Sequence, residues 1–261
     1  MENKFLHTKN LSIGYQSKKQ SIVVASDISI SLEKGKLISM IGANGIGKST
    51  LLRTLTGIQK PISGEVFLEN KSVSDFSPSE LSQKLALVLT EKLPPSNLTV
   101  FELVALGRQP YTNWIGKLTP DDVLKVNEAL HQTRTFHLSA KKHFQISDGQ
   151  LQNVLIARAL AQDTPLIVLD EPTTHLDLQH KATLFKLLKT LSSETGKCIL
   201  FSTHDVEMAI QLSDEIIVMN NRKVTQDSPQ NLIDSGHFDK LFPDESIVFD
   251  KIKRQFVFRD F

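Results

Sequence analysis

Hydrophobic and polar positions recur with two different periods along the chain. Apolar residues alternate with polar ones between Phe5 and Tyr15 and again from Ile28 to Leu32, which predicts strands. Further strand-like apolar runs lie at 37–41, 65–68, 85–89, 166–169 and 198–201, and helical segments begin near Lys48 and cover 148–161 and 178–192. Strands that alternate with helices are typical of an α/β fold with a mostly parallel sheet covered on both faces.

The segment from about 94 to 144 has a different pattern. It is biased towards helix, is broken by turn formers and contains the only tryptophan, Trp114. We therefore expect one domain over 1–261, with an α/β core over about 1–93 and 162–220 and an inserted helical lobe over about 94–161. Short strands and a helix are expected in a C-terminal extension, about 221–261, whose role the sequence leaves open.

Composition excludes several classes of protein. The 261 residues carry a formal charge of +1, so no global charge attracts the chain to nucleic acid or to anionic lipid. Cys198 is the only cysteine, which rules out a disulfide framework and fits a reducing compartment. The chain lacks both an apolar signal region and a stretch approaching the ~20 apolar residues that span a bilayer. We expect a soluble chain whose membrane role, if any, depends on a partner.

A glycine-rich loop follows the predicted strand 37–41 and precedes a helix. It fits the phosphate-binding pattern G-x-x-x-x-G-K-[ST], in which glycines let backbone N–H groups converge on phosphate oxygens. In this pattern Lys48 reaches the β- and γ-phosphates and the hydroxyl of Ser49 ligates Mg²⁺. The residues expected to bind the nucleotide here are Gly42, Ala43, Asn44, Gly45, Ile46, Gly47, Lys48, Ser49 and Thr50.

Two carboxylates end the buried strand 166–169. Ligands gather at the C-terminal ends of parallel strands, so Asp170 is expected beside Mg²⁺. Glu171 is placed to polarise the attacking water as a general base. An acidic turn has no such meaning alone, but here it completes the metal site that the phosphate loop begins.

The stretch Ile146-Ser147-Asp148-Gly149-Gln150 resembles the LSGGQ signature of ABC ATPases, and it lies just upstream of the acidic strand as in that family. The ABC pattern extends to about residue 220. The resemblance implies a P-loop NTPase core, with a mostly parallel sheet and an antiparallel N-terminal β subdomain, and an inserted helical subdomain. It also implies ATP and Mg²⁺ as cofactors, and ATP hydrolysis as the activity.

Further site residues follow from the resemblance. Tyr15 matches the aromatic that stacks on adenine, Asp177 the D-loop aspartate at the dimer interface, and His204 the switch histidine at the γ-phosphate. Ser147, Gly149 and Gln150 belong to the signature, which covers the ATP of an opposite subunit. Taken singly, Tyr15 also reads as a surface aromatic of a strand, Ser147 as a helix N-cap and His204 as a surface residue; their order favours the functional interpretation. The expected catalytic residues are Glu171, His204 and Lys48.

Two positions depart from the family pattern. Asp148 stands where the family usually has glycine, although a carboxylate at a helix start favours the helix dipole. Thr90-Glu91 follows the strand 85–89, where family members usually carry a glutamine that senses the γ-phosphate and Mg²⁺. Thr90 is therefore a candidate metal ligand, through its hydroxyl and with a shorter reach.

The segment from Leu103 to Tyr111 resembles a stretch common in the ATPases of iron-siderophore, haem and cobalamin importers; its structural alternative is a helix followed by an Arg-Gln-Pro turn. This resemblance implies a homodimer bound to integral-membrane permease subunits and, indirectly, to a substrate-binding protein. The chain would be cytoplasmic, peripheral on the inner face of the cell membrane, without a nucleic-acid partner. Two alternatives stay open: a soluble ABC ATPase acting on a cytoplasmic assembly or the ribosome, and a regulatory cassette with weak hydrolysis.

Replacing the loop lysine tests the phosphate-binding interpretation. Lys48→Ala should weaken ATP binding at least about tenfold, because a charge-assisted bond to phosphate is lost. Fluorescence titration with a labelled ATP measures the affinity, and Lys60→Ala is the control. An unchanged affinity for Lys48→Ala would contradict the assignment.

Overall fold

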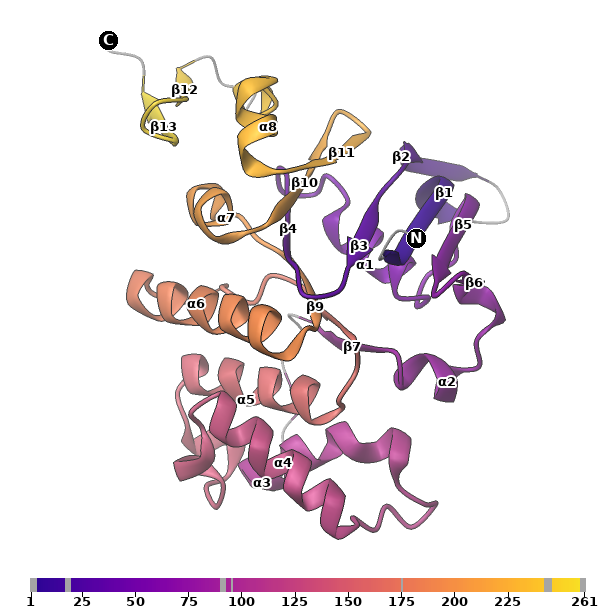
Figure 1. Cartoon of the computed structure of the whole chain (residues 1–261), viewed down its shortest axis with the longest axis vertical. Coiled ribbons are helices and arrows are strands. Elements are labelled where there is room, and N and C mark those ends of the chain that lie inside the picture. Colours follow the sequence, from indigo (N-terminus) through magenta and orange to yellow (C-terminus); the bar gives the residue numbers. More distant parts are fainter. Residues whose placement is uncertain are drawn as a thin grey trace.

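A central sheet of order β11-β10-β4-β9-β8-β7 organises the fold (Figure 1). The structure is a computed structural model, and it describes residues 4–16, 20–89, 93–94, 96–174, 176–241 and 246–258. Strands β10, β4, β9, β8 and β7 are parallel, and β11 runs antiparallel to β10 at the edge. The strands are β4 (Leu37–Ile41), β7 (Leu85–Val88), β8 (Leu166–Leu169), β9 (Cys198–Ser202), β10 (Glu215–Asn220) and β11 (Lys223–Asp227).

The central strands are continuous apolar runs because both of their faces are buried. Along β9, Ile199 and Phe201 point to the cluster that includes helices α5 (Asp148–Ala161) and α6 (Leu178–Thr195). Cys198 and Leu200 point to the opposite cluster, with helix α1 (Lys48–Leu55) and the antiparallel sheet. The predicted α/β architecture is therefore confirmed.

An antiparallel sheet of order β2-β1-β5-β6, with β3 also paired to β1, covers α1 and forms the upper right of Figure 1. Its strands are β1 (Lys4–Gln16), β2 (Ser21–Ile28), β3 (Ser31–Glu33), β5 (Ser63–Leu68) and β6 (Lys71–Ser72). The 3₁₀ turn η1 (Val73–Asp75) and helix α2 (Pro78–Ser82) connect it to β7. This sheet is the N-terminal β subdomain that the family resemblance implies.

Helices α3, α4 and α5 lie together at the bottom of Figure 1. Each begins at a capping box in which a hydroxyl accepts from the third helical N–H: Thr99 caps α3, Thr119 caps α4 and Ser147 caps α5. The remaining elements are α3 (Val100–Ala105), η2 (Leu106–Tyr111), α4 (Pro120–Gln132), η3 (Phe136–Leu138) and η4 (His143–Gln145). We assign these helices to the inserted lobe.

Arg108 connects three elements of this lobe through hydrogen bonds. Its Nε donates to Asp122 Oδ1 at 2.9 Å and its Nη1 donates to the carbonyl of Ala161 at 2.8 Å, and both charged side chains are buried. N–H and O–H groups of Thr119 also donate to Asp122 and, with the Arg108 charge, lower the pKa of that carboxyl. The segment that resembles the importer group thus has a structural role in joining η2, α4 and α5.

The end of the chain returns to the core. Helix α7 (Val206–Leu212) and helix α8 (Pro229–Asp234) share a cluster with η5 (Phe238–Lys240) and the hairpin of β12 (Ile247–Asp250) and β13 (Gln255–Phe258). The ring of Phe249 lies 5.0 Å from that of Phe238 and 5.1 Å from that of Phe256. Because β11 pairs with β10, the segment that we treat as an extension begins as an edge strand of the central sheet. Among the described residues, no helix has the length and apolar character needed to cross a membrane.

The buried ion pair of the lobe generates a stability prediction. Asp122→Ala should lower the free energy of unfolding by about 3–5 kcal/mol, since it leaves the buried Arg108 without its counter-charge. Asp121→Ala, an exposed carboxylate in the same helix turn, is the control and should cost no more than about 1 kcal/mol. Chemical denaturation measures both, and equal losses would refute a special role for the pair.

Candidate nucleotide-binding site

The phosphate loop lies between β4 and α1, as predicted. Gly47 is the N-cap of α1, with a left-handed φ of 112° that favours glycine. A Cβ on Gly47 would also lie 2.2 Å from Cγ1 of Val24 on β2. The close approach of β2 and this left-handed turn therefore exclude a side chain where the loop enters the helix, so that backbone N–H groups at the start of α1 stay accessible to an anion.

Lys48 is buried beneath this loop. Its Nζ donates to the carbonyls of Gly42 at 3.0 Å and Ala43 at 3.4 Å and lies 3.7 Å from Glu171 Oε1. Burial lowers the pKa of Lys48, and the charges of Glu171 and Asp170 oppose that shift. The ammonium of Lys48 is thus held at the loop by two carbonyls, and a phosphate would supply the counter-charge that this partly desolvated ammonium favours.

Ser202, at the end of β9, bonds both residues that follow β8: the carboxylate of Asp170 and the backbone N–H of Glu171. Its hydroxyl donates to Asp170 Oδ1 at 2.7 Å and accepts from the backbone N–H of Glu171 at 2.8 Å. Asp170 and Ser202 are both buried, so each of these groups needs its partner. Ser202 was not among the predicted site residues, although its place directly before Thr203-His204 at a strand end was a usable signal.

Glu171 occupies a strained position between two other candidate residues. Its φ of 46° lies in the left-handed region, which costs a non-glycine residue free energy and is typical of functional sites. His204 Nε2 lies 2.6 Å from Glu171 Oε1, the same oxygen that approaches Lys48. Because a carboxylate only accepts, Nε2 carries the hydrogen in this bond. The structure thus brings together all three residues predicted to be catalytic.

Tyr15 lies on the edge of the same region. Its hydroxyl hydrogen-bonds Oγ1 of Thr50 at 2.9 Å, and 57% of the side chain is exposed. Ser49 is partly buried in the first turn of α1, next to Lys48. An exposed ring fixed beside the phosphate loop is suitably placed to cover a planar base.

Ser147, Gln150 and Asp177 lie elsewhere. The N–H of Gln150 donates to Ser147 Oγ at 3.3 Å, so in this chain Ser147 caps α5. Asp177 caps α6 by accepting from the N–H of His180 at 2.8 Å. Figure 1 shows α5 well apart from α1. One chain therefore does not bring the signature to its own phosphate loop. Thr90 lies outside the described residues.

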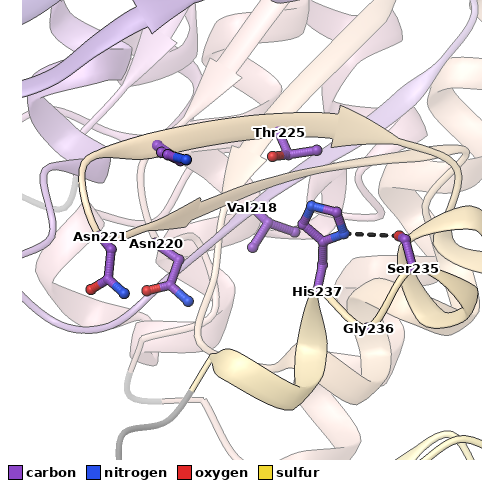
Figure 2. A pocket seen from close by; sticks show the side chains of 8 residues that line it. Val218, Asn220, Asn221, Thr225, Ser235, Gly236 and His237 are labelled. Carbon is purple, nitrogen blue, oxygen red and sulfur yellow. Dashed lines mark hydrogen bonds between the residues drawn. The ribbon is translucent and has the colours of Figure 1, made fainter.

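A separate pocket of about 330 Å³ lies between the β10–β11 hairpin and the end of α8 (Figure 2). The ring of His237 points into it, with Nδ1 2.8 Å from Ser235 Oγ, and Asn220, Asn221 and Thr225 line it. None of the predicted site residues lines this pocket.

A phosphate loop at the end of a parallel strand, with acidic residues ending a neighbouring strand, defines the P-loop nucleotide-binding class. The family model "ABC transporter" matches residues 25–174. The chain belongs to this family of ATP-binding, ATP-hydrolysing transporter subunits, and the predicted family and fold class are confirmed.

Several named relatives match over most of the chain. An ABC transporter ATP-binding protein of Methanocaldococcus jannaschii is 39% identical over 91% of this chain and 81% of its own. The achromobactin transport ATP-binding protein of Dickeya dadantii is 36% identical over 90% and 86%. The iron(3+)-hydroxamate import ATP-binding protein of Bacillus subtilis is 37% identical over 85% and 81%. The predicted resemblance to iron-siderophore importers is thus confirmed.

Solved structures agree. An inward-facing metal-chelate type ABC transporter matches with a TM-score of 0.81 and 28% identity, over 98% of this chain and 96% of that chain. A dimeric ABC cassette in a post-hydrolysis state with ADP and Pi matches with a TM-score of 0.73 and 30% identity, over 86% and 98%.

The Ser202 hydroxyl, which bonds the Asp170 carboxylate and the Glu171 backbone, is open to a direct test. Ser202→Ala should lower the ATP turnover number about tenfold, because a hydrogen bond to a charged group contributes about 1.5 kcal/mol or more to holding Asp170 and Glu171 in place. Ser39→Ala is the matched control, since Ser39 is a buried serine on the neighbouring strand β4 whose Oγ has no hydrogen-bond partner. A steady-state phosphate-release assay measures turnover, and equal rates for the two variants would exclude the role of Ser202.

Proposed function

We propose that this chain is the ATP-hydrolysing subunit of an importer for a metal chelate, of the iron-siderophore, haem or cobalamin type. The single observation that carries the hydrolytic part is the position of Glu171 Oε1, which lies within 4 Å of both Lys48 Nζ and His204 Nε2. This arrangement sets a candidate base between a phosphate-binding cation and a second donor.

In this proposal each residue has one task. Lys48 and the loop amides bind the β- and γ-phosphates, Glu171 accepts a proton from the attacking water, and His204 donates towards the γ-phosphate. Tyr15 covers the adenine. Transfer is an in-line attack of water on the γ-phosphate, for which positioning and charge stabilisation provide most of the rate.

The donors present fit magnesium. Asp170 provides a buried carboxylate and Ser49 a hydroxyl, and Mg²⁺ in nucleotide sites takes one or two protein oxygens besides phosphate and water. The residues that the structure describes contain no cluster of three or more acidic, histidine or cysteine ligands. When bound, the ion neutralises charge that develops on the phosphate oxygens.

The separation of α5 from α1 supports a head-to-tail pair. Each copy would bind ATP at its own phosphate loop, and the start of α5 in the other copy, with Ser147, Gly149 and Gln150, would close over it. Asp177 would lie at the same interface. Binding of ATP closes the pair and hydrolysis releases it. The dimeric cassette with ADP and Pi supports this arrangement by its similarity.

An apolar pocket of about 610 Å³ provides a surface for the permease. Phe76, Leu81 and Leu85 line it, together with Gln162, whose side chain donates to the carbonyls of Ser82 at 2.6 Å and Leu85 at 2.9 Å. The pocket thus connects α2 and β7 with the end of α5, the signature helix. An amphipathic helix of a permease, docked there, would move with α5. The chain would then lie on the cytoplasmic face of the membrane, with a substrate-binding protein contacting the complex only indirectly.

The names of the relatives support the cargo class, since they include achromobactin and iron(3+)-hydroxamate transport. Purification from membranes with the tagged chain tests the importer role: an integral-membrane partner that stimulates the ATPase activity and takes up a ferric siderophore is expected. Co-purification with ribosomes or a soluble assembly would instead favour the soluble alternative. Turnover that stays negligible with the permease bound would favour a regulatory cassette.

The general base is the most direct test of the chemistry. Glu171→Gln should retain ATP binding and lower turnover about 10²-fold or more, because the amide cannot accept the proton. Glu194→Gln, an exposed residue at the end of α6, is the control. Phosphate release and nucleotide titration measure the two properties, and near-normal turnover in Glu171→Gln would remove that residue from the role.

A further inference from the structure

His180 is held in a fixed orientation by the D-loop aspartate. Asp177 Oδ1 accepts from the backbone N–H of His180 at 2.8 Å and lies 2.8 Å from its ring Nδ1. The backbone and ring bonds from His180 lower the pKa of Asp177, so the carboxylate is ionised and only accepts. Nδ1 therefore carries the hydrogen, and one ring bond and one backbone bond from His180 meet the same oxygen, although 59% of the His180 side chain is exposed.

The same ring lies against the signature. A Cβ on Gly149 would lie 3.2 Å from Cδ2 and 3.7 Å from Cγ of His180, and 3.5 Å from Cδ2 of Leu176. Gly149 has an ordinary helical backbone in the first turn of α5, so its conformation does not require glycine. A Cβ at this position would therefore press on the neighbouring ring, which would have to shift by a few tenths of an ångström.

Apolar side chains lie exposed beside both parts. Leu178 follows Asp177 in the sequence and has 76% of its side-chain surface exposed, and Phe144, shortly before Ser147, has 62% exposed. Large exposed apolar groups next in sequence to these two segments are typical of a surface that a partner covers. This is the surface that the head-to-tail pair would bury.

We propose that His180 is a positioning residue that ties Asp177 to the start of α5, so that the D-loop and the signature meet a second copy as one rigid surface. The inference rests on the proposed head-to-tail function. Asp177 and Ser147 belong to different segments, and the His180 ring, beside the apolar contact of Leu176, lies between them. Its removal would let the two approach the partner's ATP independently, at an entropic cost on closure.

ATP-driven pairing in the Glu171→Gln background tests the tie. Sedimentation velocity with Mg·ATP gives the dimer dissociation constant, and binding of a fluorescent ATP analogue by the monomer checks the fold of each variant. His180→Ala should weaken pairing about tenfold, the equivalent of about 1.4 kcal/mol. His180→Asn, whose amide can donate to Asp177, should restore it to within about threefold. Gln179→Ala, exposed on the same turn, is the matched control.

A double variant separates the ring contact from any other need for glycine. Gly149→Ala should weaken pairing in the presence of His180 and add little in the His180→Ala chain, where the ring is gone. A further loss of the same size in the His180→Ala chain would overturn the inference, as would unchanged pairing of His180→Ala. A Glu171→Gln parent that does not pair at all would overturn the proposed head-to-tail function itself.

Discussion

The parallel alignment of β4, β9 and β8 is the constraint on which the site depends. Leu37 pairs with Ile199, and Leu169 pairs with Phe201, so the three strands end at the same edge of the sheet. The phosphate loop follows β4, the two carboxylates follow β8, and Ser202 ends β9. Residues far apart in the sequence meet because parallel strands deliver their carboxyl ends to one place. A one-residue slip of β8 would turn Asp170 to the other face.

Within that edge, hydrogen bonds hold a strained residue in place. The left-handed backbone of Glu171 costs about 1–3 kcal/mol. The hydroxyl of Ser202 accepts from the backbone N–H of Glu171, and the carboxylate of Glu171 contacts Lys48 and His204. These contacts offset the strain and direct the carboxylate towards the loop rather than towards solvent. The same geometry keeps the positive charge of Lys48 beside Glu171, the candidate base. A bound phosphate would take the place of Glu171 as the partner of that charge.

Much of this fold was predictable from the sequence, and the reasons for the misses are physical. The apolar runs 37–41 and 166–169 match β4 and β8, and the helix 148–161 matches α5, because these segments are buried on a regular period. The hairpin of β10 and β11 was not predicted as part of the sheet, since its edge strand has mixed polarity. The role of Arg108 also depended on tertiary contacts with Asp122 and Ala161, which are distant in sequence.

Site residues divide in the same way. The phosphate loop and the carboxylates have local signals in the sequence, because their chemistry requires particular residues at a fixed spacing along the chain. Ser202 and His180 were not predicted, since their roles depend on contacts with residues of another segment. Residues that hold two predicted motifs against each other are therefore identified by their three-dimensional contacts.

The start of α5 would face the ATP of the second copy in the proposed pair. Within one chain, Ser147 caps its own helix and Asp148 places a carboxylate in the first turn, where it stabilises the helix through the dipole. The same carboxylate would repel the triphosphate of a partner. Asp148 is exposed, so its charge lies on the surface that the pair would bury. Closure of the pair then requires that the hydrogen-bond donors at the start of α5 attract the triphosphate more strongly than Asp148 repels it. This favours a pair that stays open until it binds ATP whose negative charge is partly neutralised by magnesium.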